Sequence, residues 1–222
     1  MNIGILGGTF NPPHNGHVAA AQYAQKQLDL HRLFLIPNNQ PPHKQLPHPT
    51  ASTRQRLEMT RIMAREELPF ARVSEIEINR GGPSYTIDTV EQLRESYPYS
   101  KFCLIIGTDM LMTIESWMRS EELMEFCSLA VVARSENDRQ DIAVQAEYLR
   151  DTYEAEVIQI DCPALDISSS MIRDAVNQKE LARLVPPAVY AYITEHKLYL
   201  HPEEDDHGFH HAPETKGKRA SK

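Results

Sequence analysis

Short apolar segments typical of β-strands alternate along residues 1–200 with longer stretches typical of α-helices. The segments that we expect to form strands are residues 2–6, 32–36, 71–78, 101–106, 128–133 and 155–160. Helical stretches of about 10–15 residues separate strands in parallel βαβ units, whose crossovers are right-handed. The alternation therefore predicts an α/β fold, a doubly wound and mainly parallel sheet with helices on both faces, in a single domain over residues 1–200.

Helix-start residues divide the stretches between these strands. We expect helices over residues 16–30, from Ser52 to about Leu68, after the Gly81–Ser84 turn, over 108–126 with one interruption, over 138–153, from Ser168, and from Pro186. Ser52 is a favoured N-cap, because a serine hydroxyl accepts from the backbone of the first helical turn.

Composition and charge place the chain among ordinary globular proteins. Its 222 residues are 41% apolar and 24% charged, and no apolar run approaches the roughly 18 residues of a membrane span. The first residues do not resemble a signal peptide. Cys103 and Cys127 lie in apolar segments, where buried thiols are typical of a reducing compartment. With a net charge of −8, we expect a cytoplasmic protein without a nucleic-acid or membrane partner.

The last segment, residues 201–222, differs from the rest of the chain. It lacks apolar periodicity and carries an acidic run, four histidines and a basic end. This composition predicts a disordered tail. The alternative is a weak metal site on His207, His210 and His211, although the carboxylate or thiolate spacing of a defined metal site is missing.

The first expected strand ends in the segment GGTFNPPHNGHV, residues 7–18. Its two glycines allow a tight turn, and backbone amides at the start of the following helix favour an anion. His14 and His17 are three residues apart, which can place both rings on one side of the first turn. The segment is neither a GxGxxG fingerprint nor a Walker loop. It indicates a phosphate site, the alternative for either histidine being a helix cap or a surface position.

This segment and ISSSMIR (Ile167–Arg173) resemble the HxGH nucleotidyltransferase superfamily. More narrowly, residues 1–200 are similar to the bacterial nicotinate-nucleotide adenylyltransferases. The further segments that carry this resemblance are Pro37–Lys44, Arg56–Met59, Gly82–Val90, Ile105–Trp117 and Val131–Arg134. The resemblance implies that ATP and nicotinate mononucleotide react by direct in-line attack to give nicotinate adenine dinucleotide and pyrophosphate. It also implies Mg²⁺ bound through the ATP phosphates and water rather than by a protein cage.

The resemblance assigns the ATP half of the site to residues from both ends of the chain. His17 would contact the α-phosphate and stabilise the transition state, and His14 would help to hold the phosphates. The other residues that it assigns to ATP are Gly8, Thr9, Phe10, Arg134, Ser168, Ser169 and Arg173. Simple helix capping is the alternative for one of the serines, and a solvated surface position is the alternative for Arg173.

The nicotinate mononucleotide half comes from the middle of the chain. By the resemblance, Lys44 would bind the mononucleotide phosphate, while Tyr85 and Thr86 at a helix start would bind the carboxylate. Asp109 would contact ribose hydroxyls, with an N-cap as the alternative role. Trp117 would stack on the pyridine ring, with a plain core position as the alternative. For Arg56 we expect a structural role, such as pairing across its helix face.

Two departures from relatives and several rival functions remain. Gly107-Thr108-Asp109 stands where many relatives carry GAD, and Ser170 where threonine is common; both changes retain polar groups.

The rival substrate is nicotinamide mononucleotide, whose amide is neutral where nicotinate carries a carboxylate. Other nucleotidyltransferases and a tRNA synthetase fit less of the chain. A non-catalytic nucleotide sensor is the alternative outside enzymes. The oligomeric state is open, a homo-oligomer being one outcome.

Overall fold

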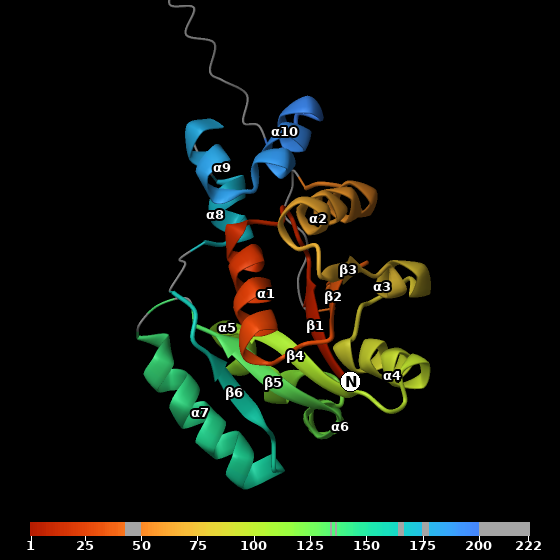
Figure 1. Cartoon of the computed structure of the whole chain (residues 1–222), viewed down its shortest axis with the longest axis vertical. Coiled ribbons are helices and arrows are strands. Elements are labelled where there is room, and N and C mark those ends of the chain that lie inside the picture. Colours follow the sequence, from red (N-terminus) through yellow and green to blue (C-terminus); the bar gives the residue numbers. More distant parts are fainter. Residues whose placement is uncertain (43–49, 134, 136, 164–166, 175–177, 200–222) are drawn as a thin grey trace, which may run out of the picture.

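Six strands form one sheet at the centre of the molecule, in a computed structural model that describes residues 1–42, 50–133, 135, 137–163, 167–174 and 178–199 (Figure 1). The sheet order is β3-β2-β1-β4-β5-β6, and every pairing within it is parallel. The strands are β1 (Asn2–Gly8), β2 (Arg32–Pro37), β3 (Ala71–Val73), β4 (Lys101–Gly107), β5 (Cys127–Val132) and β6 (Val157–Ile160). The predicted doubly wound α/β fold is therefore confirmed.

Helices cover the two faces of the sheet and enclose a separate apolar core on each. On one face pack α1 (Asn15–Gln27), α2 (Thr53–Glu67) and α10 (Pro187–Glu195). The other face is covered by α4 (Thr86–Ser96), α6 (Ser120–Phe126) and α7 (Asp138–Tyr153). Alternate side chains of β1 enter different cores, Leu6 the first and Ile5 the second. Near-continuous burial of β1, β2, β4 and β5 follows from this double cover.

Shorter helices complete the described chain: α3 (Ile76–Arg80), α5 (Thr108–Leu111), the 3₁₀ turn η1 (Ile114–Ser116), α8 (Ser169–Arg173) and α9 (Gln178–Leu184). Several predicted helix starts are confirmed by their caps. The Ser52 hydroxyl accepts from Gln55 N at 3.2 Å, and Ser168 caps α8 in the same way. Pro187 occupies the first position of α10, where the missing N–H leaves no backbone bond unmade.

Three expectations about secondary structure are wrong. The strand predicted over residues 71–78 ends at Val73, and the chain then forms α3, whose Glu77 turns inward to accept from Thr89. The helix predicted over 108–126 is broken twice, into α5, η1 and α6, and Arg119 adopts a left-handed backbone before α6. The separate helix α9 was not expected at all.

The three cysteines are buried, as expected for Cys103 and Cys127. Burial raises the pKa of Cys103 to about 11 and that of Cys127 to about 12, so these thiols stay protonated near neutral pH. Within the described residues, no helix combines the length and the apolar character that crossing a membrane requires.

The strand order reverses between β1 and β4. The chain leaves β1 toward α1 on one face and leaves β4 toward α5, next to the opposite core. The two loops therefore diverge at the carboxyl ends of adjacent strands and open a crevice between them. The segment over residues 7–18, for which the sequence predicts a phosphate site, follows β1 and therefore lies at this crevice.

Candidate active site

Two neighbouring cavities open at the carboxyl ends of β1 and β4. The larger measures about 520 Å³ and the smaller about 120 Å³. Both are lined by Gly7, Ile105, Ile106 and Met110, so they meet over the ends of these two strands. A Cβ added at Gly7 would meet nothing within 4 Å. The glycine therefore leaves open space at the junction, where a side chain would project.

The smaller cavity is lined by the two histidines of the segment after β1. His14 is the N-cap of α1, and its ring centroid lies 3.7 Å from that of His17, as their spacing predicts. The backbone N–H of His14 donates to Nδ1 of His17 at 3.1 Å. Neutral His17 therefore carries its proton on Nε2, a donor suited to a phosphate oxygen. The ring of Phe10, itself buried, also packs on His17, with ring centroids 4.8 Å apart.

Gly16 allows the His14 ring to lie close to the helix. A Cβ at Gly16 would stand 2.9 Å from Nδ1 and 3.0 Å from Cε1 of His14. These distances are shorter than van der Waals contact, so any other residue would displace the imidazole. A side chain at position 16 would clash with the His14 ring, which explains the glycine between the two histidines; the spacing of the motif alone does not show this.

The three residues expected to offer backbone amides lie around the turn after β1. Gly8 lines the larger cavity. Thr9 accepts from the Asn38 side chain through its hydroxyl, at 3.2 Å. Phe10 has a left-handed backbone with φ of 48°, uncommon outside glycine, while its ring is buried in the core. The turn is therefore held by the buried Phe10 ring and by Asn38, which directly follows β2.

Helix α8 packs against the same turn. The Ser169 hydroxyl donates to the Pro12 carbonyl at 2.9 Å, and Nη1 of Arg173 donates to the Asn11 carbonyl at 2.7 Å. Arg173 is therefore not a solvated surface side chain. Ser168 is occupied as a cap, accepting from Met171 N at 3.2 Å. The two segments that resemble the superfamily motifs thus touch, although more than 150 residues separate them; Arg134 lies outside the described residues.

Arg56 is buried beneath the loops after β1 and β2, with no exposed surface. Its guanidinium donates to the Thr9 carbonyl at 2.6 Å and to the Asn38 and Asn39 carbonyls at 2.8 and 3.1 Å. Across its own helix face the guanidinium donates to the Thr53 hydroxyl at 3.3 Å, and among the described residues no carboxylate forms an ion pair with it, so the expected structural role is confirmed. Burial lowers its pKa. Arg56 joins the two loops through their carbonyl oxygens.

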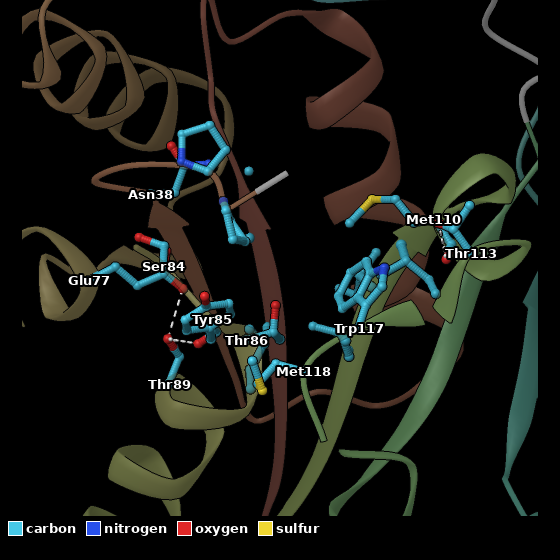
Figure 2. A pocket seen from close by; sticks show the side chains of 18 of the residues that line it. Asn38, Glu77, Ser84, Tyr85, Thr86, Thr89, Met110, Thr113, Trp117 and Met118 are labelled. Carbon is cyan, nitrogen blue, oxygen red and sulfur yellow. Dashed lines mark hydrogen bonds between the residues drawn. The ribbon is translucent and has the colours of Figure 1, made fainter. Parts of the chain in front are cut away.

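One wall of the larger cavity is the start of α4 (Figure 2). Tyr85 and Thr86 stand there as the sequence predicts, next to the buried Ser84, whose hydroxyl accepts from Asn39 N at 3.0 Å. Tyr85 occupies the N-cap position, so the free amides of the first helical turn begin beside it.

Glu77 and Thr89 also line this wall and were missed by sequence reasoning. The Thr89 hydroxyl donates to Glu77 at 2.8 Å and accepts from Arg80 at 3.0 Å (Figure 2 shows the Glu77–Thr89 bond). Burial raises the pKa of Glu77, and its hydrogen bonds with Thr89 and Ser84 partly oppose that rise. The available signal was the charged Glu77 within residues 71–78, a segment whose apolar residues alternate as in a strand.

The opposite wall carries Met110, Thr113 and Trp117 (Figure 2), and Asp109 also lines the cavity. Trp117 is half-buried and faces the cavity, so it is not a plain core residue. Gly107 is the N-cap of α5, and Asp109 lies in its first turn, so the N-cap alternative for Asp109 is wrong. Lys44 lies outside the described residues. Across the parts of the chain that the structure describes, no group of three or more His, Cys, Asp or Glu side chains could hold a metal ion.

Comparison with known proteins adds to this geometry. Residues 5–175 match the family described as cytidylyltransferase-like. The chain is 39% identical over 198 residues to a probable nicotinate-nucleotide adenylyltransferase of Carboxydothermus hydrogenoformans, covering 89% of this chain and 97% of the relative. It is 38% identical to the protein of the same description from Bacillus pumilus, with the same coverage. A structure of Plasmodium falciparum nicotinic acid mononucleotide adenylyltransferase complexed with NaAD superposes with a TM-score of 0.72 at 20% identity, covering 89% of this chain and 97% of that one.

Proposed function

The chain belongs to the nicotinate-nucleotide adenylyltransferases, within the cytidylyltransferase-like family, and from this premise we propose that it joins ATP and nicotinate mononucleotide. The products are nicotinate adenine dinucleotide and pyrophosphate. The observation that carries the proposal is the pair of cavities that meet over Gly7. One has two imidazoles suited to phosphate, and the other has a helix start facing an aromatic ring. Two substrates held there would have their reacting ends at the junction.

The smaller cavity suits the phosphates of ATP. A phosphate oxygen of the mononucleotide attacks the α-phosphorus in line, and the bond from that phosphorus to the pyrophosphate oxygen breaks. Negative charge passes to the leaving pyrophosphate. His17, with its proton on Nε2, donates to an α-phosphate oxygen, and His14 holds the neighbouring oxygens. Such transfer depends on positioning and charge stabilisation, and no protein nucleophile is required.

Ser169 and Arg173 bond to the Pro12 and Asn11 carbonyls, just before the histidine pair, and with Ser168 they suit the β- and γ-phosphates. A guanidinium offers several donors in a fixed plane, and Arg173 is already oriented by its bond to the Asn11 carbonyl. Arg134, Gly8, Thr9 and Phe10 complete the ATP half in this proposal. Donors of Gly8, Thr9 and Phe10 would contact the nucleotide along the turn after β1, and the Arg134 side chain would bind it from the segment after β5.

The larger cavity suits nicotinate mononucleotide. The first-turn amides of α4, with Tyr85 and Thr86, would bind the nicotinate carboxylate. Trp117 on the opposite wall would stack on the pyridine ring. Asp109 would accept from ribose hydroxyls, and Lys44 would bind the mononucleotide phosphate. A volume of about 520 Å³ lies within the usual range for a small-molecule site.

Mg²⁺ enters this proposal with ATP. The side chains that line the smaller cavity, as far as they are described, carry imidazole nitrogens and no carboxylate. Mg²⁺ prefers oxygen ligands and keeps several waters, so phosphate oxygens rather than this cavity would hold it. Bound there, it would neutralise charge on the triphosphate. We also propose a cytoplasmic location, because buried and unpaired thiols fit a reducing compartment.

A paired turnover assay tests the function and its rival substrate. ATP and Mg²⁺ are offered with nicotinate or nicotinamide mononucleotide, while pyrophosphate is followed and the dinucleotide is identified by mass. We expect a strong excess of the nicotinate product. Equal rates would show that the α4 wall does not select the carboxylate. No product from either would favour a nucleotide sensor.

The His17→Ala variant separates catalysis from binding. We expect turnover to fall on the order of 10³-fold while ATP affinity changes by less than about tenfold, because the imidazole acts mainly on transition-state charge. Tyr99→Phe is the control, since Tyr99 is 95% exposed and lines neither cavity. Retained turnover in His17→Ala would contradict the assigned role.

A further inference from the structure

Tyr199, the last residue that the structure describes, turns back into the molecule and reaches the turn after β1. Its side chain is only 8% exposed and belongs to the core between the sheet and α10. Its hydroxyl donates to Oδ1 of Asn11 at 2.6 Å, across 188 residues of sequence. The turn that precedes His14 is thus in direct contact with the segment after α10.

Asn11 is the centre of a buried hydrogen-bond network. It is 1% exposed, and its Oδ1 also accepts from the Ala51 backbone at 3.3 Å, while its amide nitrogen donates to the Thr50 hydroxyl. Its carbonyl accepts from Nη1 of Arg173 at 2.7 Å. The Ala51 backbone N–H can only donate, so it requires Oδ1 of Asn11 on its side, and the Tyr199 hydroxyl adds a second donor to the same oxygen that holds the amide in this orientation. The Asn11 side chain in turn holds the peptide whose carbonyl anchors Arg173.

The backbone around Tyr199 is held in a form suited to this contact. Lys197 and Tyr199 both have left-handed backbones, with φ of 52° and 56°. Residues other than glycine adopt this region only when the surrounding structure determines it. The Leu198 N–H bonds back to the Ile193 carbonyl at 2.9 Å, which turns the chain inward at the end of α10. The packing therefore directs the phenol toward Asn11 rather than toward solvent.

We propose that Tyr199 is a positioning residue for the ATP half of the site, acting through Asn11 on Arg173 and on the turn that carries His14. Pro12 and Pro13 separate Asn11 from His14. Because proline restricts the backbone, a rotation of Asn11 is passed on to His14 rather than absorbed. No residue of this network lines either cavity, and it adjoins the smaller one through the turn that leads to His14. The proposal rests on the proposed function, since it assumes that this half receives the ATP phosphates.

The Tyr199→Phe variant removes one oxygen and keeps the ring that fills the core. Asn11 Oδ1 keeps its bond from Ala51, so no buried acceptor is left without a donor. We expect KM for ATP to rise about threefold to tenfold, the equivalent of one lost hydrogen bond. KM for nicotinate mononucleotide should stay within about twofold. The melting temperature should fall by only about 2–4 °C. Tyr99→Phe, at the 95% exposed position, is the matched control.

A double-mutant cycle with Arg173→Lys distinguishes positioning from general stability. If Tyr199 acts through Asn11 on Arg173, the two changes in ATP affinity are not additive, because each removes the same constraint. Additive effects would overturn the proposal. An equal rise in both KM values, or no change in either, would also overturn it.

Direct binding keeps this test separate from the proposed function. Calorimetry with a non-hydrolysable ATP analogue measures affinity in wild type and Tyr199→Phe without turnover. If wild type binds the analogue but makes no dinucleotide, the proposed function fails, and the affinity ratio still tests Tyr199. Unchanged affinity in Tyr199→Phe would refute the inference even if wild type is fully active.

Discussion

Replacing Gly16 with alanine should lower activity while leaving stability almost unchanged. The added Cβ would stand 2.9 Å from Nδ1 of His14, whereas ordinary contact begins at 3.4 Å. The imidazole must therefore move by about 0.5 Å. A misplacement of about 1 Å in a catalytic group costs roughly 10²-fold in rate, so a shift of half that size should cost about tenfold or more.

The same change favours the helix. Gly16 lies in the first turn of α1, and its φ lies outside the left-handed region, so alanine fits the backbone. Alanine is better than glycine in a helix by up to about 1 kcal/mol. This gain opposes the strain of displacing the His14 ring, which is 7% exposed and has little room to move. We therefore expect the free energy of unfolding to change by less than about 1 kcal/mol.

Pyrophosphate release and urea denaturation, measured on the same preparations, test both halves of this expectation. Lys26→Ala is the control, because Lys26 is exposed on the same helix and far from the two rings. Full activity in Gly16→Ala would refute the reasoning from the His14 contact. So would a loss of activity accompanied by a loss of several kcal/mol in stability, because the effect would then be a general one.

Two other substitutions test the buried charges. Arg56→Lys cannot reach the three carbonyls of Thr9, Asn38 and Asn39 together, so we expect it to lower the free energy of unfolding by about 1–3 kcal/mol in urea titrations; a change below about 0.5 kcal/mol would contradict this. Glu77→Gln tests the raised pKa of Glu77. Because the folded state holds the Glu77 proton more tightly than the unfolded state, this group stabilises the fold most below its ordinary pKa of 4.5, and that contribution is lost as pH rises through the folded pKa. Urea titrations at several pH values should show a smaller decline in Glu77→Gln than in wild type over that window, and identical curves would contradict the assignment.

Local chemistry explains what could be predicted from the sequence. Ser52, Ser168 and Pro187 mark helix starts because the cap or ring acts within one turn. The spacing of His14 and His17 likewise determines that their rings meet, since both belong to the first turn of one helix. The alternation of strand and helix segments along the chain was enough to predict the fold class, because it is typical of parallel sheets and every described strand pairing is parallel.

The features that sequence reasoning missed depend on partners distant in the chain or on other elements. Arg56 finds its acceptors in two loops that only the sheet brings together. The strand expected over residues 71–78 stops early because Glu77 is drawn toward Thr89 on a later helix. Tyr199 meets Asn11 across nearly the whole domain. For each of these residues, the partner lies on another structural element, so the neighbouring sequence does not indicate the contact.

The way the two cavities share Gly7 has a consequence for redesign. Apart from the ends of β1 and β4 and from Met110, which lines both cavities, the described lining of the larger cavity comes from residues 38–42, 77–89 and 109–118. That of the smaller comes from residues 14–20, 132–133, 162–163 and 167. In the proposed function, the two substrates would therefore bind on largely different segments that share the ends of β1 and β4 and Met110. We therefore expect substitutions in the first set to change which small molecule is accepted while His14 and His17 keep their geometry. The fold thus permits new acceptor specificities to be selected without re-inventing the chemistry.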